Sequence, residues 1–232
     1  FLIPLIMALF RLRKFYGKGI KKYKTKDILV YSIPVLISMI SITLFFTLDV
    51  FLVKHFFSDV EAGYYAALAM LGKVIYFGSI SIVYVMFPKV VELSSKNMAS
   101  RGILFKSLAI VGLFCGAATL LYYLFPIFTV NLFFGDKFLS ISPLLGRFAI
   151  FMGLLSLIYV LIFYNLSLQT KSFIYILVIF NIIEIVLLYL FHSSINQVVN
   201  VLLFLTLALL LILITYTLIR TKNETLNSNT GI

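Results

Sequence analysis

The chain has 232 residues, of which 62% are hydrophobic and only 12% are charged. Soluble globular domains are roughly 45–50% apolar and about 25% charged, so this composition excludes an ordinary soluble domain. It also excludes a disordered chain and a collagen. The formal net charge of +11 does not indicate a nucleic-acid-binding module, because the basic residues gather on one side of the long apolar runs.

Six apolar runs follow one another along the chain. Each is long enough to cross a bilayer as a helix, which needs about 20 residues. They are too long for the strands of an outer-membrane barrel, which alternate in polarity over about ten residues. We therefore predict an all-α membrane protein with six transmembrane helices. The expected spans cover residues 28–53, 64–87, 103–125, 141–165, 173–191 and 198–219.

Prolines lie inside or at the ends of four expected spans. Pro34 lies within the first span and predicts a kink there. Pro88 and Pro126 are expected to end the second and third spans. Pro143 lies in the first turn of the fourth span, where proline is tolerated.

The segments that flank the spans predict how the chain is organised. Residues 1–10 are expected to be the end of a preceding transmembrane helix, so that the chain would be the C-terminal part of a longer protein. Residues 11–27 hold eight Lys or Arg and are expected to form a basic cytoplasmic linker. The six-helix lobe is expected over 28–220. The polar tail, 221–232, is expected to be disordered.

The distribution of basic residues predicts the orientation. With 11–27 inside, fifteen of the nineteen Lys and Arg fall on the inner side, whereas the outer loops hold only Lys54 and Lys137. Cytoplasmic loops of membrane proteins carry such an excess. The sequence therefore predicts a cytoplasmic C-terminus.

Four ionisable residues lie inside the expected spans, namely Asp49, Lys73, Arg147 and Glu184. Such a residue costs at least about 2.5–3.5 kcal/mol near the middle of a span, so it usually faces protein or water. With a rise of about 1.5 Å per residue, all four fall in the outer half of the membrane, each on a different helix. Two interpretations stay open. Asp49–Lys73 and Arg147–Glu184 form pairs that hold the helices together, or the four charges line a cavity for a charged solute or a coupling ion.

The second interpretation predicts two groups of site residues. Guanidinium and ammonium groups suit phosphate or carboxylate, and a buried carboxyl can bind a proton or Na⁺. Asn181 lies three residues before Glu184, so the two share one helix face. The candidates are, for substrate binding, Arg147, Lys73 and Tyr76, and, for ion coupling or charge pairing, Asp49, Glu184 and Asn181.

The sequence contains no signature of catalysis. The expected outer loops are short and carry no Ser/His/Asp set and no metal cluster, and the inner loops carry no Gly-rich phosphate-binding motif. Cys115 is the only cysteine, and His55 and His192 are isolated. We expect no enzymatic activity, no cofactor, no metal site and no nucleic-acid partner.

Three segments, in this order, carry a family resemblance. They read DVFLVKHFFSDVEAGYYAA from Asp49, FPKVVELSSK from Phe87 and FFGDKFLSISPLLGRFA from Phe133. An Asp at the outer end of a helix is followed by a basic residue and Gly-x-Tyr, then by a Phe-Pro exit to a basic loop, then by Phe-Gly before the next helix. In this order the chain resembles the polysaccharide-biosynthesis, O-antigen-type flippases of the multidrug/oligosaccharidyl-lipid/polysaccharide exporter superfamily. The residues that match are Asp49, Lys54, Gly63, Tyr65, Phe87, Pro88, Lys89, Phe134 and Gly135.

The resemblance implies two six-helix lobes joined by a basic cytoplasmic linker, of which this chain would supply the second lobe. It implies a multi-pass protein of the inner (plasma) membrane that moves an undecaprenyl-pyrophosphate-linked glycan to the outer leaflet. The mechanism would be alternating access, driven by an ion gradient or the membrane potential. The implied partners are membrane lipids, the polyprenyl-pyrophosphate-linked glycan and other polysaccharide-assembly proteins.

Other functions remain as alternatives. A drug/cation antiporter of the same superfamily would favour acids over bases in its cavity, whereas here the two balance. A membrane glycan polymerase or ligase would need a long outer loop with Arg or His. A scaffold that does not transport is the third alternative.

Overall fold

The computed structural model describes residues 25–96 and 98–230, and the side chains of residues 32–96 and 98–220. The helix end expected at 1–10 and most of the linker expected at 11–27 lie outside the described residues. The described part is helical apart from short connections and contains no strand, so the predicted all-α class is confirmed.

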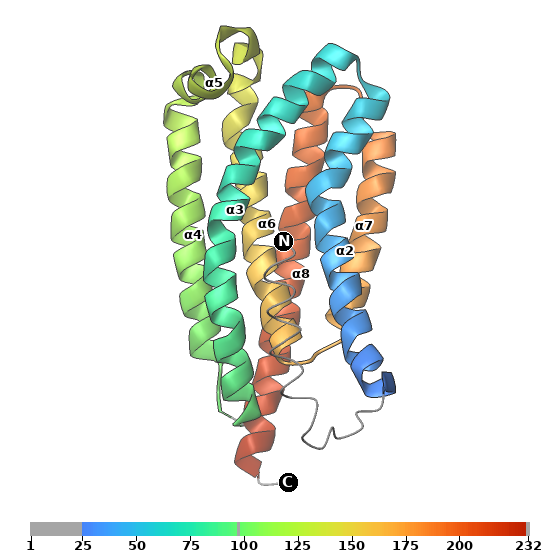
Figure 1. Ribbon diagram of the computed structural model, residues 1–232, viewed down its shortest axis with the longest axis vertical. Helices are drawn as coiled ribbons and strands as arrows, with labels where there is room; N and C mark the ends of the chain where they lie inside the picture. The colour runs from blue at the N-terminus through green and yellow to red at the C-terminus, as the bar shows by residue number, and fades with distance from the viewer. Residues whose placement is uncertain (1–24, 97, 231–232) are drawn as a thin grey trace, which may run out of the picture. The chain divides into compact units, whose positions relative to one another are not determined.

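Among the described residues, six helical segments are long and apolar enough to cross a membrane, as predicted, with Asp136–Ser167 counted as one segment. Within residues 35–230, Figure 1 shows the long helices running alongside one another. The described elements are α2 (Thr25–Phe56), α3 (Asp59–Ser95), α4 (Arg101–Leu124), α5 (Pro126–Phe134), the 3₁₀ helix η1 (Asp136–Ile141), α6 (Ser142–Ser167), α7 (Phe173–Leu190) and α8 (Ile195–Thr230).

The chain divides into two compact units, residues 1–34 and residues 35–232. Of the first unit, the structure describes only the beginning of α2, residues 25–34. The rest of α2 and all later helices belong to the second unit. All packing described below lies within this second unit.

Helix α6 is central to the second unit. It packs against α3, α4 and α8, whereas α7 packs mainly against α8. Nearly every side chain of α6 from Leu145 to Ser167 is buried, as expected for a helix that is hydrophobic on all sides. In contrast, α4 keeps a broad exposed face of apolar residues, which suits contact with lipid.

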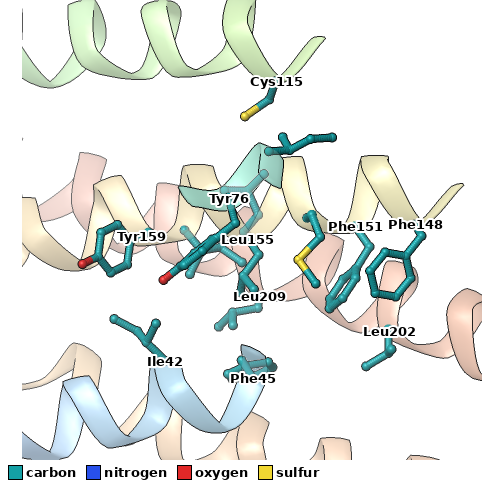
Figure 2. Packing of buried hydrophobic residues seen from close by; sticks show 14 of the residues in the cluster. Ile42, Phe45, Tyr76, Cys115, Phe148, Phe151, Leu155, Tyr159, Leu202 and Leu209 are labelled. Atoms are coloured by element: carbon teal, nitrogen blue, oxygen red, sulfur yellow. The ribbon is translucent and has the colours of Figure 1, made fainter. Parts of the chain in front are cut away.

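Helix α2 contributes apolar side chains to the core that α3, α6 and α8 build. Ile42 and Phe45 of α2 lie on the side that faces Tyr76 of α3 and Tyr159 of α6 (Figure 2). All four side chains are buried. One apolar cluster therefore joins α2, α3 and α6, each of which carries a predicted site residue.

The expectation that Pro88 ends the second span is wrong, because α3 continues through Pro88 to Ser95. A proline inside a helix removes one hydrogen bond and bends the helix, but the helix can continue beyond it. Here Glu92 forms ion pairs with Lys89, at 2.9 Å, and with Lys96, at 2.7 Å. Pairs at i, i+3 and i, i+4 spacing support the last turns of a helix.

The connection between the third and fourth spans is folded rather than an open loop. Pro126 begins α5 at a position where its missing N–H group removes no helical hydrogen bond. Gly135 ends α5 with a φ of 76°, a backbone conformation that glycine adopts without steric strain. η1 then leads directly into α6.

The last membrane span, Ile195–Arg220, agrees with the predicted 198–219, but its helix continues beyond the span. α8 runs to Thr230, whereas the tail after residue 220 is expected from sequence to be disordered. The segment from Ile195 to Thr230 contains neither proline nor glycine, so no residue in it interrupts the helix. The tail is therefore helical as far as it is described.

Candidate functional site

The α2–α3 hairpin has a short, well-capped turn. Ser58 caps the start of α3: its hydroxyl accepts a hydrogen bond from the Glu61 N–H, and the Glu61 carboxylate accepts one from the Ser58 N–H, at 3.2 Å. This is a capping box. Lys54 and Asp59 form an exposed ion pair across the turn. The two helices therefore run antiparallel, and residues equally far from the turn meet at the same depth.

Asp49 and Tyr65 meet in this way. Asp49 lies seven residues before the end of α2, and Tyr65 lies six residues after the start of α3. Both side chains are fully buried. The Tyr65 hydroxyl donates a hydrogen bond of 2.7 Å to Asp49 Oδ2. From the sequence, Tyr65 is identified only as part of a family motif, and this contact is not predicted. The signal that predicts it is the nearly equal distance of Asp49 and Tyr65 from the turn.

Glu184 of α7 brings a second carboxyl to the same region. Its side chain is fully buried, and it is close enough to Asp49 and Tyr65 for electrostatic interaction. One turn earlier, the Asn181 amide donates a hydrogen bond of 2.9 Å to the Leu177 carbonyl. We call Asp49, Tyr65, Asn181 and Glu184 the acid cluster.

The acid cluster has more acceptor oxygens than donors. In the part of the chain whose side chains are described, four buried oxygens have no hydrogen-bond partner: Asp49 Oδ1, Asn181 Oδ1 and both Glu184 carboxylate oxygens. Buried polar groups normally have such partners, and a buried carboxylate without a counter-charge is strongly unfavourable. Neutralising this cluster therefore requires a proton or a bound cation.

Lys73 does not provide the missing counter-charge through a direct contact. Its ammonium group lies 4.4 Å from the centroid of the Phe46 ring, a cation–π geometry. It interacts with Asp49 only through the longer-range electrostatic field. Of the two pairs in the first interpretation, Asp49–Lys73 is thus not formed as an ion pair.

Arg147 contacts α8 instead of α7. Its Nη1 donates hydrogen bonds to the side-chain oxygens of Asn196, at 2.6 Å, and Asn200, at 3.3 Å. The two asparagines lie one turn apart near the start of α8 and face α6. The Arg147–Glu184 pair is therefore not formed either. Neither asparagine is among the site residues predicted from sequence, although two amides at i, i+4 spacing at the start of an apolar helix are a recognisable signal.

Tyr76 lies in an aromatic group between α2, α3 and α6. Its ring centroid is 4.7 Å from that of Phe46 and 5.5 Å from that of Tyr159. The hydroxyls of Tyr76 and Tyr159 point away from Phe148 and Phe151 (Figure 2). Tyr76 and Lys73 therefore both contact Phe46, which links two of the substrate-binding candidates.

The structure thus divides the six candidates among three places. Asp49, Glu184 and Asn181 lie in the acid cluster, Lys73 and Tyr76 surround Phe46, and Arg147 lies apart with its two asparagines. Within residues 32–96 and 98–220, no group of three or more His, Cys, Asp or Glu side chains is arranged to hold a metal ion.

Six membrane-length helices around a core with buried carboxyls define a multi-pass α-helical membrane protein. Residues 1–94 match the family model described as polysaccharide biosynthesis protein. The match covers the first 94 of the 232 residues, and it is consistent with the exporter superfamily named above. It includes α2, nearly all of α3 and their site residues. No curated protein and no solved structure gives a significant match. The family match and the membrane-length helices together point to a membrane protein of polysaccharide biosynthesis.

Proposed function

We propose that the protein exports a lipid-linked oligosaccharide across the plasma membrane by alternating access and performs no covalent chemistry. The observation that carries the proposal is the buried acid cluster, which lies on membrane-length helices of a chain with a polysaccharide-biosynthesis family match. Ionisable groups inside membrane spans typically mark ion or substrate pathways. In this proposal the α2–α3 turn lies outside the cell and the C-terminus is cytoplasmic.

The acid cluster is the coupling site in this proposal. Asp49 and Glu184 lie on α2 and α7, so an ion bound between them connects two helices. Binding or releasing a proton or Na⁺ then changes how strongly the helices hold together. A ligand shifts a conformational equilibrium only through different affinities for the two states, and a site shared between helices provides such a difference.

The cationic candidates suit the anionic part of the substrate. Lys73 has no acidic partner within ion-pair distance among the described side chains. Arg147 uses Nη1 for its two asparagines. A guanidinium has five N–H donors, so further donors of Arg147 remain for a phosphate oxygen.

A drug/cation antiporter is the second candidate function. The observation that favours it is that the two buried carboxyls form no ion pair with Lys73 or Arg147. Carboxyls left without a basic partner are suited to an organic cation as well as to a small ion.

Deleting the gene that encodes this chain tests the proposal. We expect loss of the surface polysaccharide and accumulation of its lipid-linked precursor at the cytoplasmic face. The wild-type gene should restore export, whereas Asp49→Asn and Glu184→Gln should not. Asp59→Asn is the matched control, because it removes an exposed carboxylate on the α2–α3 hairpin. Normal polysaccharide in the deletion strain, together with greater sensitivity to cationic drugs, would favour the antiporter.

A further inference from the structure

One face of α3 carries polar and aromatic residues through the middle of its span. Lys73, Phe77, Ser81 and Tyr84 are spaced four, four and three residues apart. With about 100° per residue, they lie within about 80° of the helix circumference. We call these four residues the α3 stripe. Phe77 is 57% exposed and Tyr84 is 62% exposed, so the stripe is an accessible face.

Rings from two other helices extend the stripe. Phe46 of α2 lies 5.4 Å from Phe77 in an edge-to-face arrangement and also contacts Lys73. Tyr159 of α6 interacts through its hydroxyl with Tyr84. The stripe therefore presents aromatic faces, hydroxyl groups and one ammonium group on the same side of α3.

The α3 stripe differs from the exposed face of α4. In the middle of α4 the exposed residues are Ala109, Ile110, Leu113, Phe114, Gly116, Ala117 and Leu120. That face is apolar throughout, as contact with lipid requires. A lysine facing lipid near the middle of a span is unfavourable, and among the described side chains Lys73 has no acidic partner within ion-pair distance. The stripe is therefore better suited to line a path through the protein than to contact lipid.

We propose that the α3 stripe binds the sugar rings of the exported glycan, an inference that rests on the proposed function above. A sugar ring has an apolar C–H face and a rim of hydroxyls. Tyrosine matches both, because it combines an apolar ring with a polar hydroxyl. Ligand sites commonly have this character, mostly aromatic with a few placed polar groups. Lys73 lies at one end of the stripe, where it faces an acidic sugar or the pyrophosphate.

Binding of two lipids to the purified protein in detergent tests this inference. One probe is the polyprenyl-pyrophosphate-linked glycan extracted from the host, and the other is undecaprenyl pyrophosphate without sugars. Phe77→Leu and Tyr84→Leu remove a ring but keep an apolar side chain. Each should weaken binding of the glycan-bearing lipid about three- to tenfold, the range for losing one aromatic contact. Neither should change binding of the sugar-free lipid.

Two exposed aromatic residues outside the stripe provide matched controls. Phe105 of α4 is 54% exposed, and Tyr175 of α7 is 73% exposed. Phe105→Leu and Tyr175→Leu should leave the affinity for both lipids unchanged. Tyr84→Phe keeps the ring and should retain most of the affinity, which separates lost stacking from misfolding.

The outcomes separate this inference from the proposed function. If Phe77→Leu and Tyr84→Leu leave both affinities unchanged, or weaken both lipids equally, the stripe does not bind sugars, while the proposed export function stands. If the wild-type protein binds neither lipid, the export function is wrong and the inference about the stripe is wrong with it.

Discussion

The Tyr65 hydroxyl donates a hydrogen bond of 2.7 Å to Asp49 Oδ2 across the α2–α3 hairpin. Among the described residues, no other side chain donates a hydrogen bond to the carboxyl of Asp49 or of Glu184. The other Asp49 oxygen and both Glu184 oxygens have no donor. Tyr65 therefore sets the position of Asp49, and the remaining oxygens are left for a proton or a cation.

Replacing Tyr65 by phenylalanine should destabilise the protein. The change leaves a buried carboxyl with no donor, which costs about 1–3 kcal/mol and should lower the melting temperature in detergent by roughly 2–10 °C. Tyr64→Phe is the neighbouring control, because the Tyr64 side chain is only partly buried and its ring packs against Phe138 rather than against Asp49. Equal melting temperatures for the two variants would show that the Tyr65–Asp49 contact does not contribute to stability.

Ion binding at the acid cluster should stabilise the folded protein. A ligand present at 100 times its Kd adds about 2.7 kcal/mol. If the cluster binds Na⁺, replacing KCl by NaCl at constant ionic strength should raise the melting temperature of the wild type. If it binds a proton, the melting temperature should respond to pH and not to Na⁺. Asp49→Asn and Glu184→Gln should abolish whichever response the wild type shows, and a response that survives both changes would place the ion elsewhere.

The number and depth of the spans could be predicted from sequence because they depend on local properties. About 20 consecutive apolar residues form a spanning helix, and charges such as Asp49 and Glu184 stand out within such runs. Depth follows from counting residues at about 1.5 Å each. The same counting misplaces the ends of α3 and α8, since Pro88 bends a helix without ending it and the polar end of α8 contains no residue that stops a helix.

Which side chains meet could not be predicted, because depth does not specify how a helix is rotated about its axis. Asp49 and Lys73 lie at similar depth, yet Asp49 contacts Tyr65 and Lys73 contacts Phe46. In the same way, Arg147 points to α8 and not to Glu184 on α7. The rotation of each helix about its axis is set by the packing of the whole apolar core, so it cannot be predicted from the sequence of one helix alone.

Reporter fusions test the proposed orientation, which rests on the fifteen-to-two distribution of Lys and Arg. Fusions after residues 96, 171 and 222 should report the cytoplasm, and fusions after residues 59, 137 and 195 should report the outside. The described helix ends place these six positions in or next to connections between spans, or in the last turns of α8. Reversal at any one position would contradict the assignment of the adjacent span.

Arg147 provides the sharpest test of substrate binding. In the export proposal its free donors bind pyrophosphate, so Arg147→Ala should abolish glycan export at normal protein level. Arg147→Lys should restore export only in part, because it keeps the charge and loses the bidentate fork.

The contacts of Arg147 allow its role in binding to be separated from a role in helix packing. If Arg147 serves only to join α6 to α8, then Asn196→Ala combined with Asn200→Ala should reduce export as much as Arg147→Ala, since both remove the same hydrogen bonds. If Arg147 binds substrate, the asparagine double variant should retain far more export than Arg147→Ala.

The Arg147→Ala/Glu184→Gln double variant should remain inactive in either case, because the two side chains form no pair whose joint removal could restore function. Recovery of export in that variant would show that the pair forms in another state of the transport cycle, and normal export in Arg147→Ala cells would remove Arg147 from the substrate path.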